Sequence, residues 1–225
     1  HQRPNYNILY SSRSQVINLL SKPDDKYLEI GVEYGQTFLN THFKPENKTG
    51  VDPDPKFNIE QQCVKFKFKK CTSDDFFSEH ANYNTKYDVI FIDGMHQVEY
   101  FLRDINNSIK ILTKGGSIFI DDILPLTYNE QLKIPRKYYY ENGILKYGEE
   151  WTGDIWKVIY HILKKYEEHL LKTEIKYFYH INYRGVLHLK LTSNFEIDTN
   201  EIDTINSYNY FDEFPKYLEY LIQFI

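Results

Sequence analysis

The sequence predicts one α/β domain with a mostly parallel sheet of seven strands, helices on both faces and one antiparallel strand late in the chain. Short apolar segments alternate with amphipathic segments of helical length between residues 26 and 120. The segment 87–92 (YDVIFI) is almost entirely apolar, as expected of a central parallel strand. Two later segments, 175–181 and 186–191, are typical of a β-hairpin and supply the antiparallel strand.

The other elements follow from hydrophobic period and from the residues that end helices. The predicted hairpin turns near Arg184 and Gly185, and Gly115 and Gly116 end a helix before a buried strand. The segment 65–70 (KFKFKK) alternates in a way that places Phe66 and Phe68 inward on an edge strand. We expect further strands at 26–30, 49–52, 64–68 and 117–120, and helices at 11–21, 36–41, 98–112, 155–171 and 214–225.

Composition excludes several classes of protein. The 225 residues suit one domain, 1–225, with 1–23 as an N-terminal helical extension, and aromatic residues at 17% exclude a disordered chain. The sequence contains no run of 18 apolar residues, so no membrane span is expected. A net charge of −5 disfavours nucleic acid as a partner. Two cysteines, Cys63 and Cys71, fit a reducing, cytoplasmic compartment. Because residue 1 is not methionine, we expect a domain cut from a longer chain.

The turn after the first predicted strand reads Glu29-Ile30-Gly31-Val32-Glu33-Tyr34-Gly35. This is not the dinucleotide pattern G-x-G-x-x-G, because position 33 is glutamate. It resembles the E-x-G-x-x-x-G motif of class I S-adenosylmethionine-dependent methyltransferases, although a generic glycine turn would look similar. The open turn from Gly31 to Gly35 suits a donor without phosphates, and Glu29 can organise the turn and the ammonium group of the donor.

Further cofactor contacts are expected at the ends of the next strands. Asp52 follows Gly31 by 21 residues, a spacing at which a carboxylate can accept both ribose hydroxyls. Ser73 and Asp74 follow the third strand, where methyltransferases place the adenine, and Asp93 ends the fourth. The alternatives are an Asp52 that only ends a strand before a proline turn, and a Ser73 or Asp74 that only caps a helix.

Three later segments sharpen the resemblance. They are Phe91 to His96 (FIDGMH), 100–104 (YFLRD) and 114–122 (KGGSIFIDD), and residues 153–157 (GDIWK) add to them. Over residues 24–160 the chain resembles macrocin-type sugar O-methyltransferases, and also the methyltransferase domains of chlorovirus multidomain glycan-building proteins. The resemblance implies a Rossmann-like methyltransferase fold, S-adenosylmethionine as cofactor and a sugar hydroxyl, such as one of rhamnose, as acceptor. It also implies fusion to glycosyltransferase domains and, for a viral protein, the host cytoplasm.

The acidic residues at two strand ends predict a metal site. Asp93 ends the fourth strand, and Asp121 and Asp122 end the fifth, which should lie about 4.8 Å away in the sheet. Carboxylates suit Mg²⁺ or Mn²⁺, and the cation would lower the pKa of the acceptor hydroxyl. The resemblance implies the same role, although Met95 stands where macrocin-type relatives carry a further acid. The alternative is that Asp121 or Asp122 only caps a turn.

His96 is the predicted general base, because an ordinary imidazole pKa near 6.5 suits proton removal at neutral pH. The alternative is a histidine that packs against the cofactor or caps the next helix. Asp154 is expected to bind an acceptor hydroxyl or to begin the helix that follows it, and Asp104 is expected to be structural.

The segment 123–150 is too long for an ordinary connection and is a predicted substrate lid. Its tyrosines and the adjacent Trp151 can pack on sugar rings, and its polar side chains can bond hydroxyls. The alternative is that the aromatic residues pack on the domain or on a second subunit, as in a homodimer. The residues are Tyr128, Tyr138, Tyr139, Tyr140, Tyr147 and Trp151, with Glu130, Glu141 and Asn142 as polar partners.

Three other functions compete with a sugar O-methyltransferase. A small-molecule enzyme acting on a catechol would share the same site and could use the cation or work without it. A nonenzymatic nucleoside-binding domain would keep the glycine turn, but Asp93, His96, Asp121 and Asp122 argue for retained chemistry. The glycine spacing disfavours an NAD-linked enzyme.

Overall fold

The structure is a computed structural model that describes residues 12–62, 65–79, 84–135, 138–147, 150–180 and 183–223. Its central feature is a seven-stranded sheet in the order β3-β2-β1-β4-β5-β9-β8. Neighbouring strands from β3 to β5 are parallel, and β9 is antiparallel to both β5 and β8. The predicted fold class is therefore confirmed. The strands are β1 (Tyr27–Ile30), β2 (Lys48–Val51), β3 (Lys67–Lys69), β4 (Tyr87–Ile92), β5 (Leu112–Ile120), β8 (Lys176–His180) and β9 (Tyr183–Lys190).

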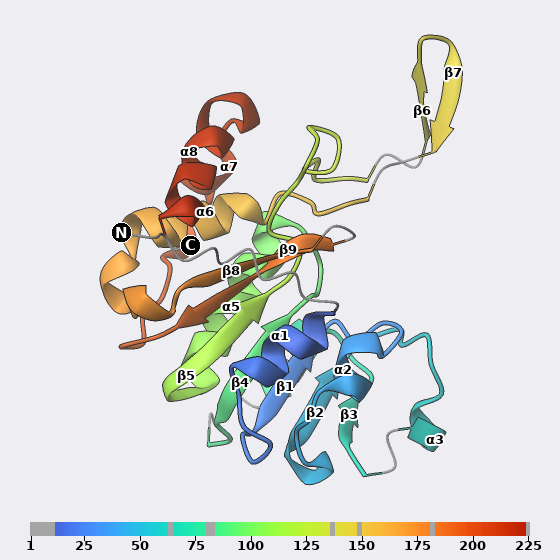
Figure 1. The fold of residues 1–225 in the computed structure, drawn as a ribbon, viewed down its shortest axis with the longest axis vertical. Helices are drawn as coiled ribbons and strands as arrows, with labels where there is room; N and C mark the ends of the chain where they lie inside the picture. The colour runs from blue at the N-terminus through green and yellow to red at the C-terminus, as the bar shows by residue number, and fades with distance from the viewer. Residues whose placement is uncertain are drawn as a thin grey trace, which may run out of the picture.

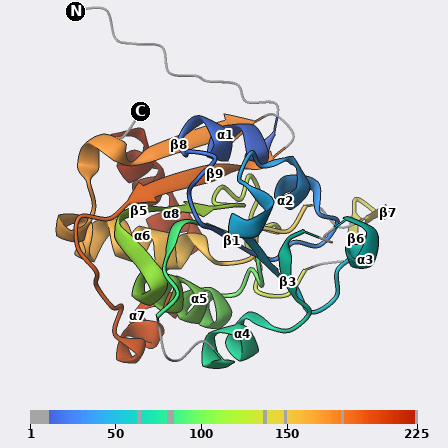
Figure 2. The same ribbon diagram turned by 90° about the horizontal axis from the view of Figure 1, so that it is seen from below.

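Helices cover both faces of this sheet (Figures 1 and 2). Alternation along β4 shows the division, because Val89 and Phe91 pack toward α1 and α2 while Ile90 and Ile92 pack toward α5 and α6. The larger core lies on the α5 and α6 side and includes Trp156, which is fully buried. The helices are α1 (Arg13–Leu19), α2 (Gln36–Asn40), α3 (Ile59–Gln62), α4 (Ser73–Glu79), α5 (Val98–Ile111), α6 (Trp156–Lys165), α7 (Ile202–Asn206) and α8 (Tyr210–Ile222).

The order of the strands reverses between β1 and β4. From β1 the chain builds outward through β2 to β3 and then returns to place β4 on the other side of β1. At such a switch point the loops that follow the strands diverge and leave room for a ligand at the carboxyl ends. The turn after β1 and the residues after β4 and β5 therefore define the functional edge of the sheet.

The edge strand β3 bears out the alternating pattern of residues 65–70. Phe66 and Phe68 are half-buried and make edge-to-face contacts with Phe38 of α2, while the lysines between them are exposed. The strand itself runs from Lys67 to Lys69, later than predicted. Cys71 is a free thiol, and Cys63 lies outside the described residues, as do residues 1–11 of the predicted N-terminal extension.

The hairpin turn was predicted at the wrong place. His180 pairs with Tyr183, so the connection falls at residues 181–182, outside the described part. Gly185 lies within β9 with a φ of +82°, beside a shift of register after Phe178. A bulge that needs a left-handed residue, rather than a turn, therefore explains this glycine.

The segment 123–150 contains a hairpin that was not predicted, formed by β6 (Tyr138–Glu141) and β7 (Ile144–Tyr147). Figure 1 shows this hairpin standing away from the rest of the domain. The C-terminal helix α8 begins at Tyr210, four residues before the predicted start. Among the described residues, none of the helices has the length and apolar character needed to span a bilayer.

Candidate active site

The turn after β1 is packed directly against the end of β4. Gly31 has a φ of +83°, and a Cβ atom at this position would lie 1.9 Å from the carbonyl oxygen of Asp93. The N–H of Asp93 donates to the carbonyl of Ile30 over 2.8 Å, and the N–H of Gly31 donates to Val51 over 2.9 Å. Only glycine fits this close approach of two strand ends. The turn therefore keeps the cofactor side of the site next to Asp93.

Asp52 shapes the same turn from the end of β2. Its buried carboxylate accepts the N–H of Glu33 at 2.8 Å through Oδ2 and the N–H of Asp54 at 2.7 Å through Oδ1. Glu33 and Gly35 both have positive φ, and α2 begins directly after Gly35. Each carboxylate oxygen has two acceptor sites, so Asp52 can hold the turn and still accept two hydroxyl groups.

Glu29 is buried in the strand itself. Burial raises the pKa of Glu29 to about 8, and its carboxylate accepts the hydroxyl of Tyr27. Lys48 of β2, also buried, donates to the carbonyls of Phe38 and Thr41 at the end of α2. These contacts give Glu29 a structural environment on the α1 and α2 side of the sheet. A contact from Glu29 to a methyl donor stays a prediction.

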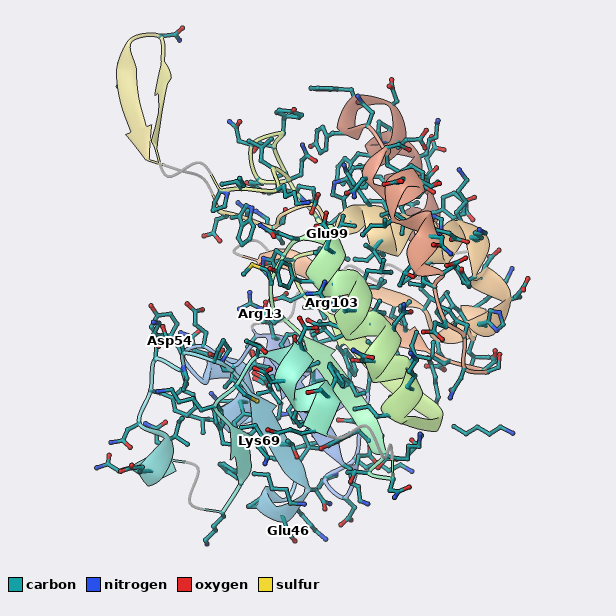
Figure 3. The ribbon with its side chains drawn as sticks, turned by 180° about the vertical axis from the view of Figure 1, so that it is seen from behind. Arg13, Glu46, Asp54, Lys69, Glu99 and Arg103 are labelled. Atoms are coloured by element: carbon teal, nitrogen blue, oxygen red, sulfur yellow. The ribbon has the colours of Figure 1, made fainter. Side chains whose placement is uncertain are left out.

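The residues after β3 lie beside α5. The Thr72 hydroxyl accepts the N–H of Asp75 at 3.1 Å, so Thr72 is the N-cap of α4 rather than Ser73 or Asp74. Asp74 accepts two hydrogen bonds from the guanidinium of Arg103, at 2.8 and 2.9 Å. Arg103 lies on α5 and is labelled in Figure 3. The sequence did not single out Arg103, because an arginine on the polar face of a helix is ordinary.

Asp104 is the structural residue that the sequence predicted. Burial raises its pKa to about 7, a hydrogen bond with Ser73 lowers it in part, and a Cβ at Gly94 would lie 3.3 Å from its Oδ2. Ser73 and Asp104 therefore lie together under the loop after β4.

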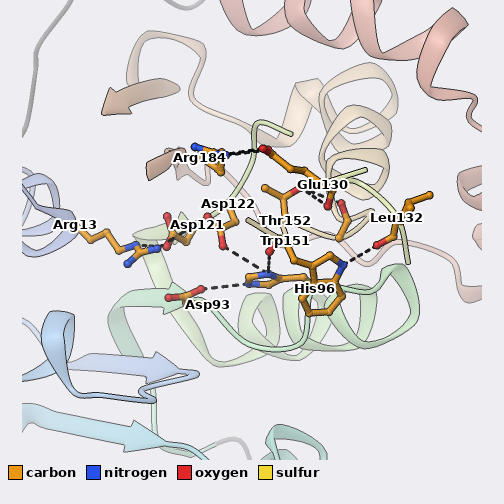
Figure 4. Close-up of polar contacts among 11 residues, drawn as sticks. Arg13, Asp93, His96, Asp121, Asp122, Glu130, Leu132, Trp151, Thr152 and Arg184 are labelled. Atoms are coloured by element: carbon orange, nitrogen blue, oxygen red, sulfur yellow. Dashed lines mark hydrogen bonds and ion pairs between the residues drawn. The ribbon is translucent and has the colours of Figure 1, made fainter. Parts of the chain in front are cut away.

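Three of the residues predicted to bind a cation or to act as the base lie close together at the ends of β4 and β5 (Figure 4). Ligand atoms of Asp93, His96 and Asp122 all lie within 4.8 Å of one another. Nε2 of His96 is 3.3 Å from Oδ1 of Asp93, and Nδ1 is 3.6 Å from Oδ2 of Asp122. Asp122 has a φ of +52°, an uncommon conformation for a residue with a side chain. Backbone strain at this position accompanies the convergence of the three groups, as is common at functional sites.

The hydrogen bonds of His96 define which ring nitrogen carries a proton. Nδ1 lies 3.2 Å from the carbonyl of Trp151, which can only accept, so Nδ1 is the donor. Nε2 then faces the Asp93 carboxylate. The negative charge of this carboxylate favours either a second proton on the ring or a cation bound to the carboxylate itself. Burial lowers the pKa of His96, but the hydrogen bond to Asp93 and the charge of Asp122 more than offset this and raise the pKa to about 9.

Asp121 points away from this group. Its side chain is fully buried and forms an ion pair with Arg13 of α1, and Nη2 of Arg13 lies 4.0 Å from Asp122. Burial, followed by the charges of Asp122 and Asp93, raises the pKa of Asp121, and burial raises that of Asp122 to about 6. Arg13 was not foreseen, because no spacing in the sequence links it to residues a hundred positions later.

The predicted acceptor-binding residues have structural partners. Asp154 is buried and accepts the N–H of Val98 at 2.9 Å, so it caps α5 rather than its own helix. Trp151 lies beside His96, with ring centroids 5.4 Å apart, and its Nε1 donates to Leu132 at 2.6 Å. Tyr128 is partly exposed and stacks on Phe211 of α8 at 5.2 Å. The side chains of Tyr138, Tyr139, Tyr140, Glu141 and Tyr147 lie outside the described part of the structure.

The predicted lid is fixed to the domain at its base. The buried carboxylate of Glu130 accepts two hydrogen bonds from Arg184 of β9, at 2.8 and 2.9 Å, and one from the N–H of Leu126. The carbonyl of Glu130 accepts the N–H groups of Thr152 and Gly153. A Cβ at Gly153 would lie 1.6 Å from the carbonyl oxygen of His96. The lid base, Trp151 and His96 are therefore held in one arrangement.

Comparisons with known proteins agree with this geometry. Residues 28–123 match the model of a methyltransferase domain family. An uncharacterized mimivirus protein (R132 of Acanthamoeba polyphaga mimivirus) is 28% identical over an alignment of 130 residues, and the match covers 51% of this chain and 59% of that protein. The chain therefore spans less than two thirds of this relative.

Two solved structures were compared with this chain, and the first of them shows a similar fold. An O-methyltransferase from Bacillus cereus, in complex with SAH, superposes with a TM-score of 0.56 at 13% identity and 83% coverage of both chains. The MycE methyltransferase of the mycinamycin pathway, in complex with Mg, SAH and mycinamycin VI, gives a TM-score of 0.47 at 12% identity, covering 83% of this chain and 50% of that one. Residues 28–123 thus match a methyltransferase domain family, and the chain has the fold of an O-methyltransferase that was solved in complex with SAH.

Proposed function

We propose that this methyltransferase domain transfers a methyl group from S-adenosylmethionine to a sugar hydroxyl of a glycan, with a divalent cation and His96 as a general base. The observation that carries the proposal is the group of Asp93, His96 and Asp122 beside the Gly31 turn. A donor bound at the turn would present its methyl group to an acceptor held at these residues. The resemblance to macrocin-type enzymes and to chlorovirus glycan-building proteins supports a sugar such as rhamnose, and fusion to glycosyltransferase domains in a longer chain.

The cofactor contacts follow from the geometry of the turn. Asp52 would accept the ribose hydroxyls, because its carboxylate is oriented by two backbone N–H groups and retains acceptor capacity. Gly31 and Gly35 leave the turn without side chains where the methionine end of the donor would lie, and Glu29 lies beneath it. Ser73 and Asp74 would border the adenine. Asp93 lies next to the Gly31 turn and also belongs to the cluster with His96 and Asp122, so it would face both the donor and the acceptor.

The donor set at the strand ends fits a divalent cation. Asp93 and Asp122 offer hard carboxylate oxygens, which suit Mg²⁺ or Mn²⁺, and Asp121 is the third carboxylate in the predicted set. When bound, the cation would hold the acceptor oxygen and lower the pKa of its hydroxyl.

The base step uses the orientation of His96. Its Nδ1 is fixed by the carbonyl of Trp151, which leaves Nε2 to accept the hydroxyl proton. At neutral pH a ring with a pKa of about 9 is protonated and cannot act as a base. A cation bound to Asp93 and Asp122 would offset their negative charge, and this would lower the pKa of His96 toward its usual range. The acceptor oxygen would then bond to the methyl carbon, the carbon–sulfur bond would break, and S-adenosylhomocysteine would leave.

The test is a direct comparison of acceptors. A rhamnose-ended oligosaccharide and a catechol are incubated separately with the protein, S-adenosylmethionine and Mn²⁺, and the products are followed by mass spectrometry. We expect the oligosaccharide to gain a methyl group faster than the catechol. Faster methylation of the catechol would assign the domain to small-molecule chemistry. Binding of S-adenosylhomocysteine without turnover of any acceptor would favour a nonenzymatic nucleoside-binding domain.

A further inference from the structure

The positively charged side chain of Arg13, on the helix α1, lies beside the clustered carboxylates at the ends of β4 and β5. Figure 4 shows its side chain reaching from α1 to Asp121. The side chain of Asp121 is fully buried, and that of Arg13 is only 20% exposed. The second guanidinium contact, between Nη2 and Oδ1 of Asp122, is 4.0 Å. The guanidinium therefore lies against two of the three carboxylates that the sequence assigned to a cation.

A cation is needed at this position because Asp93, Asp121 and Asp122 concentrate negative charge in a buried space. Removing one partner of a buried ion pair leaves an uncompensated charge and is strongly destabilising. A divalent cation would be held by Asp93 and Asp122, and its charge would repel the guanidinium of Arg13, which lies 4.0 Å from Asp122. Arg13 and a divalent cation thus share Asp122 as a partner and oppose each other.

We propose that Arg13 and a divalent cation compete for the carboxylate of Asp122. Arg13 is then a positioning residue that holds the cation-free site together and sets the affinity of the site for the cation. Cation binding would displace Nη2 of Arg13 from Asp122, which would then hold the cation together with Asp93. This inference rests on the proposed function, because it assumes that the site takes a divalent cation.

A polar groove beside Arg13 can accommodate its guanidinium group when the contact with Asp122 is lost. Arg13 lines an open groove of about 460 Å³ between α1 and α2, with Ser12, Gln36 and Thr37 among its other lining residues. The helix α1 is anchored separately by Val16 and Ile17, which are buried in the core on this side of the sheet. The Nη2 end of the guanidinium can therefore turn from Asp122 toward the polar groove while α1 keeps its packing.

The experiment measures Mn²⁺ affinity by titration calorimetry in wild type, Arg13→Ala and Arg13→Lys. We expect Arg13→Ala to bind Mn²⁺ about tenfold more tightly or better, because a repelling unit charge is removed. Arg13→Lys keeps the charge and should stay close to wild type. Lys110→Ala is the matched control, since it removes one positive charge from an exposed pair with Glu196. Asp122→Asn should abolish the binding heat.

Thermal unfolding provides the second readout. Without metal, Arg13→Ala should melt at a lower temperature than wild type. Mn²⁺ should raise the melting temperature of Arg13→Ala by more than it raises that of wild type. Equal or weaker Mn²⁺ affinity in Arg13→Ala would overturn the competition. Absence of Mn²⁺ binding in both proteins would also overturn it, and S-adenosylhomocysteine binding would then show whether the methyltransferase assignment survives. If Arg13→Ala does not fold, Arg13→Gln replaces it with the same expectations.

Discussion

Nε2 of His96 lies 3.3 Å from Oδ1 of Asp93, three residues earlier at the end of β4. The two side chains share one edge of the sheet with Asp122, and the carbonyl of Trp151 fixes the opposite ring nitrogen. Asp93 thus has two effects on His96. It aligns the ring, and it raises the pKa of the ring, so that at neutral pH a free base forms only when the carboxylate charge is engaged elsewhere.

The first prediction concerns His96 as the base. His96→Ala should lower kcat by about 10²–10⁴, the range for loss of a general base, while S-adenosylhomocysteine binding stays close to wild type. Steady-state kinetics and calorimetry measure the two quantities. Because the pKa of His96 is raised to about 9, activity at low cation concentration should increase with pH toward that value. Saturating Mn²⁺ should move the rise to lower pH, and the variant should lack it. A loss confined to donor affinity would make His96 a packing residue.

The second prediction concerns the cation. A chelator should remove activity, and Mg²⁺ or Mn²⁺ should restore it, because Asp93 and Asp122 need a cation to hold the acceptor oxygen. Asp93→Asn and Asp122→Asn should each remove most of the activity at any cation concentration that restores wild type. Rates are measured after dialysis against the chelator. Full activity in the chelator would refute a cation-dependent mechanism and leave His96 to act alone.

The third prediction concerns the ribose contact. Asp52→Ala should weaken S-adenosylhomocysteine binding by about 1–3 kcal/mol, the usual cost of losing hydrogen bonds to a charged group. Part of this loss would come from the turn, because the same carboxylate holds the N–H groups of Glu33 and Asp54. Asp54→Ala is the matched control, since this exposed side chain pairs with Lys56 on the surface (Figure 3). Calorimetry that finds equal affinities in both variants and wild type would place the ribose elsewhere.

Much of the fold was predictable because it depends on local patterns. The apolar run at residues 87–92, the glycine turn at Gly31 and the acidic strand ends each specify an element and the edge on which its last residue lies. Once the strands are parallel and adjacent, the acidic residues that follow Ile92 of β4 and Ile120 of β5 lie at the same edge of the sheet. His96 follows because it is three residues beyond Asp93.

What the sequence did not predict depends on contacts between distant segments. Arg13 reaches Asp121, Arg184 reaches Glu130, and Asp154 caps a helix 56 residues earlier in the chain. In each case a common residue type acquires its role from tertiary packing alone. The misplaced hairpin turn has a related cause, because Gly185 has the positive φ that a turn would need but uses it in a bulge.

The fourth prediction concerns stability in acid. Burial lowers the pKa of His188 from 6.5 to about 4, and the ring stacks on Phe119 and lies 3.0 Å from the Ser117 hydroxyl. Below pH 6.5 the unfolded chain therefore takes up a proton at this residue that the folded protein does not. The free energy of unfolding should decrease between pH 6.5 and 4, by at most about 1.4 kcal/mol per pH unit from this group. His188→Gln should show a shallower decrease in denaturant unfolding, and an identical slope would exclude His188 as the source.

The fifth prediction concerns the hairpin β6–β7 and the acceptor. Glu130 and Arg184 anchor the base of the lid beside His96, whereas the hairpin stands away from the domain (Figure 1). Replacing residues 136–149 with a short Gly-Ser linker should therefore leave S-adenosylhomocysteine affinity unchanged. The KM for a rhamnose-ended oligosaccharide should rise about tenfold or more, because the tyrosines that we propose to pack on sugar rings would be lost.

A matched variant separates loss of the hairpin from loss of the lid base. Glu130→Gln removes the charge that pairs with Arg184 and should affect both kcat and KM, because Glu130 also holds Thr152 and Gly153 next to His96. Oligosaccharide turnover is measured for both variants, with size-exclusion chromatography to follow the oligomeric state. Unchanged oligosaccharide KM in the linker variant would remove the hairpin from the acceptor site. If the linker variant also changed from a dimer to a monomer, the tyrosines of the hairpin would belong to a subunit interface instead.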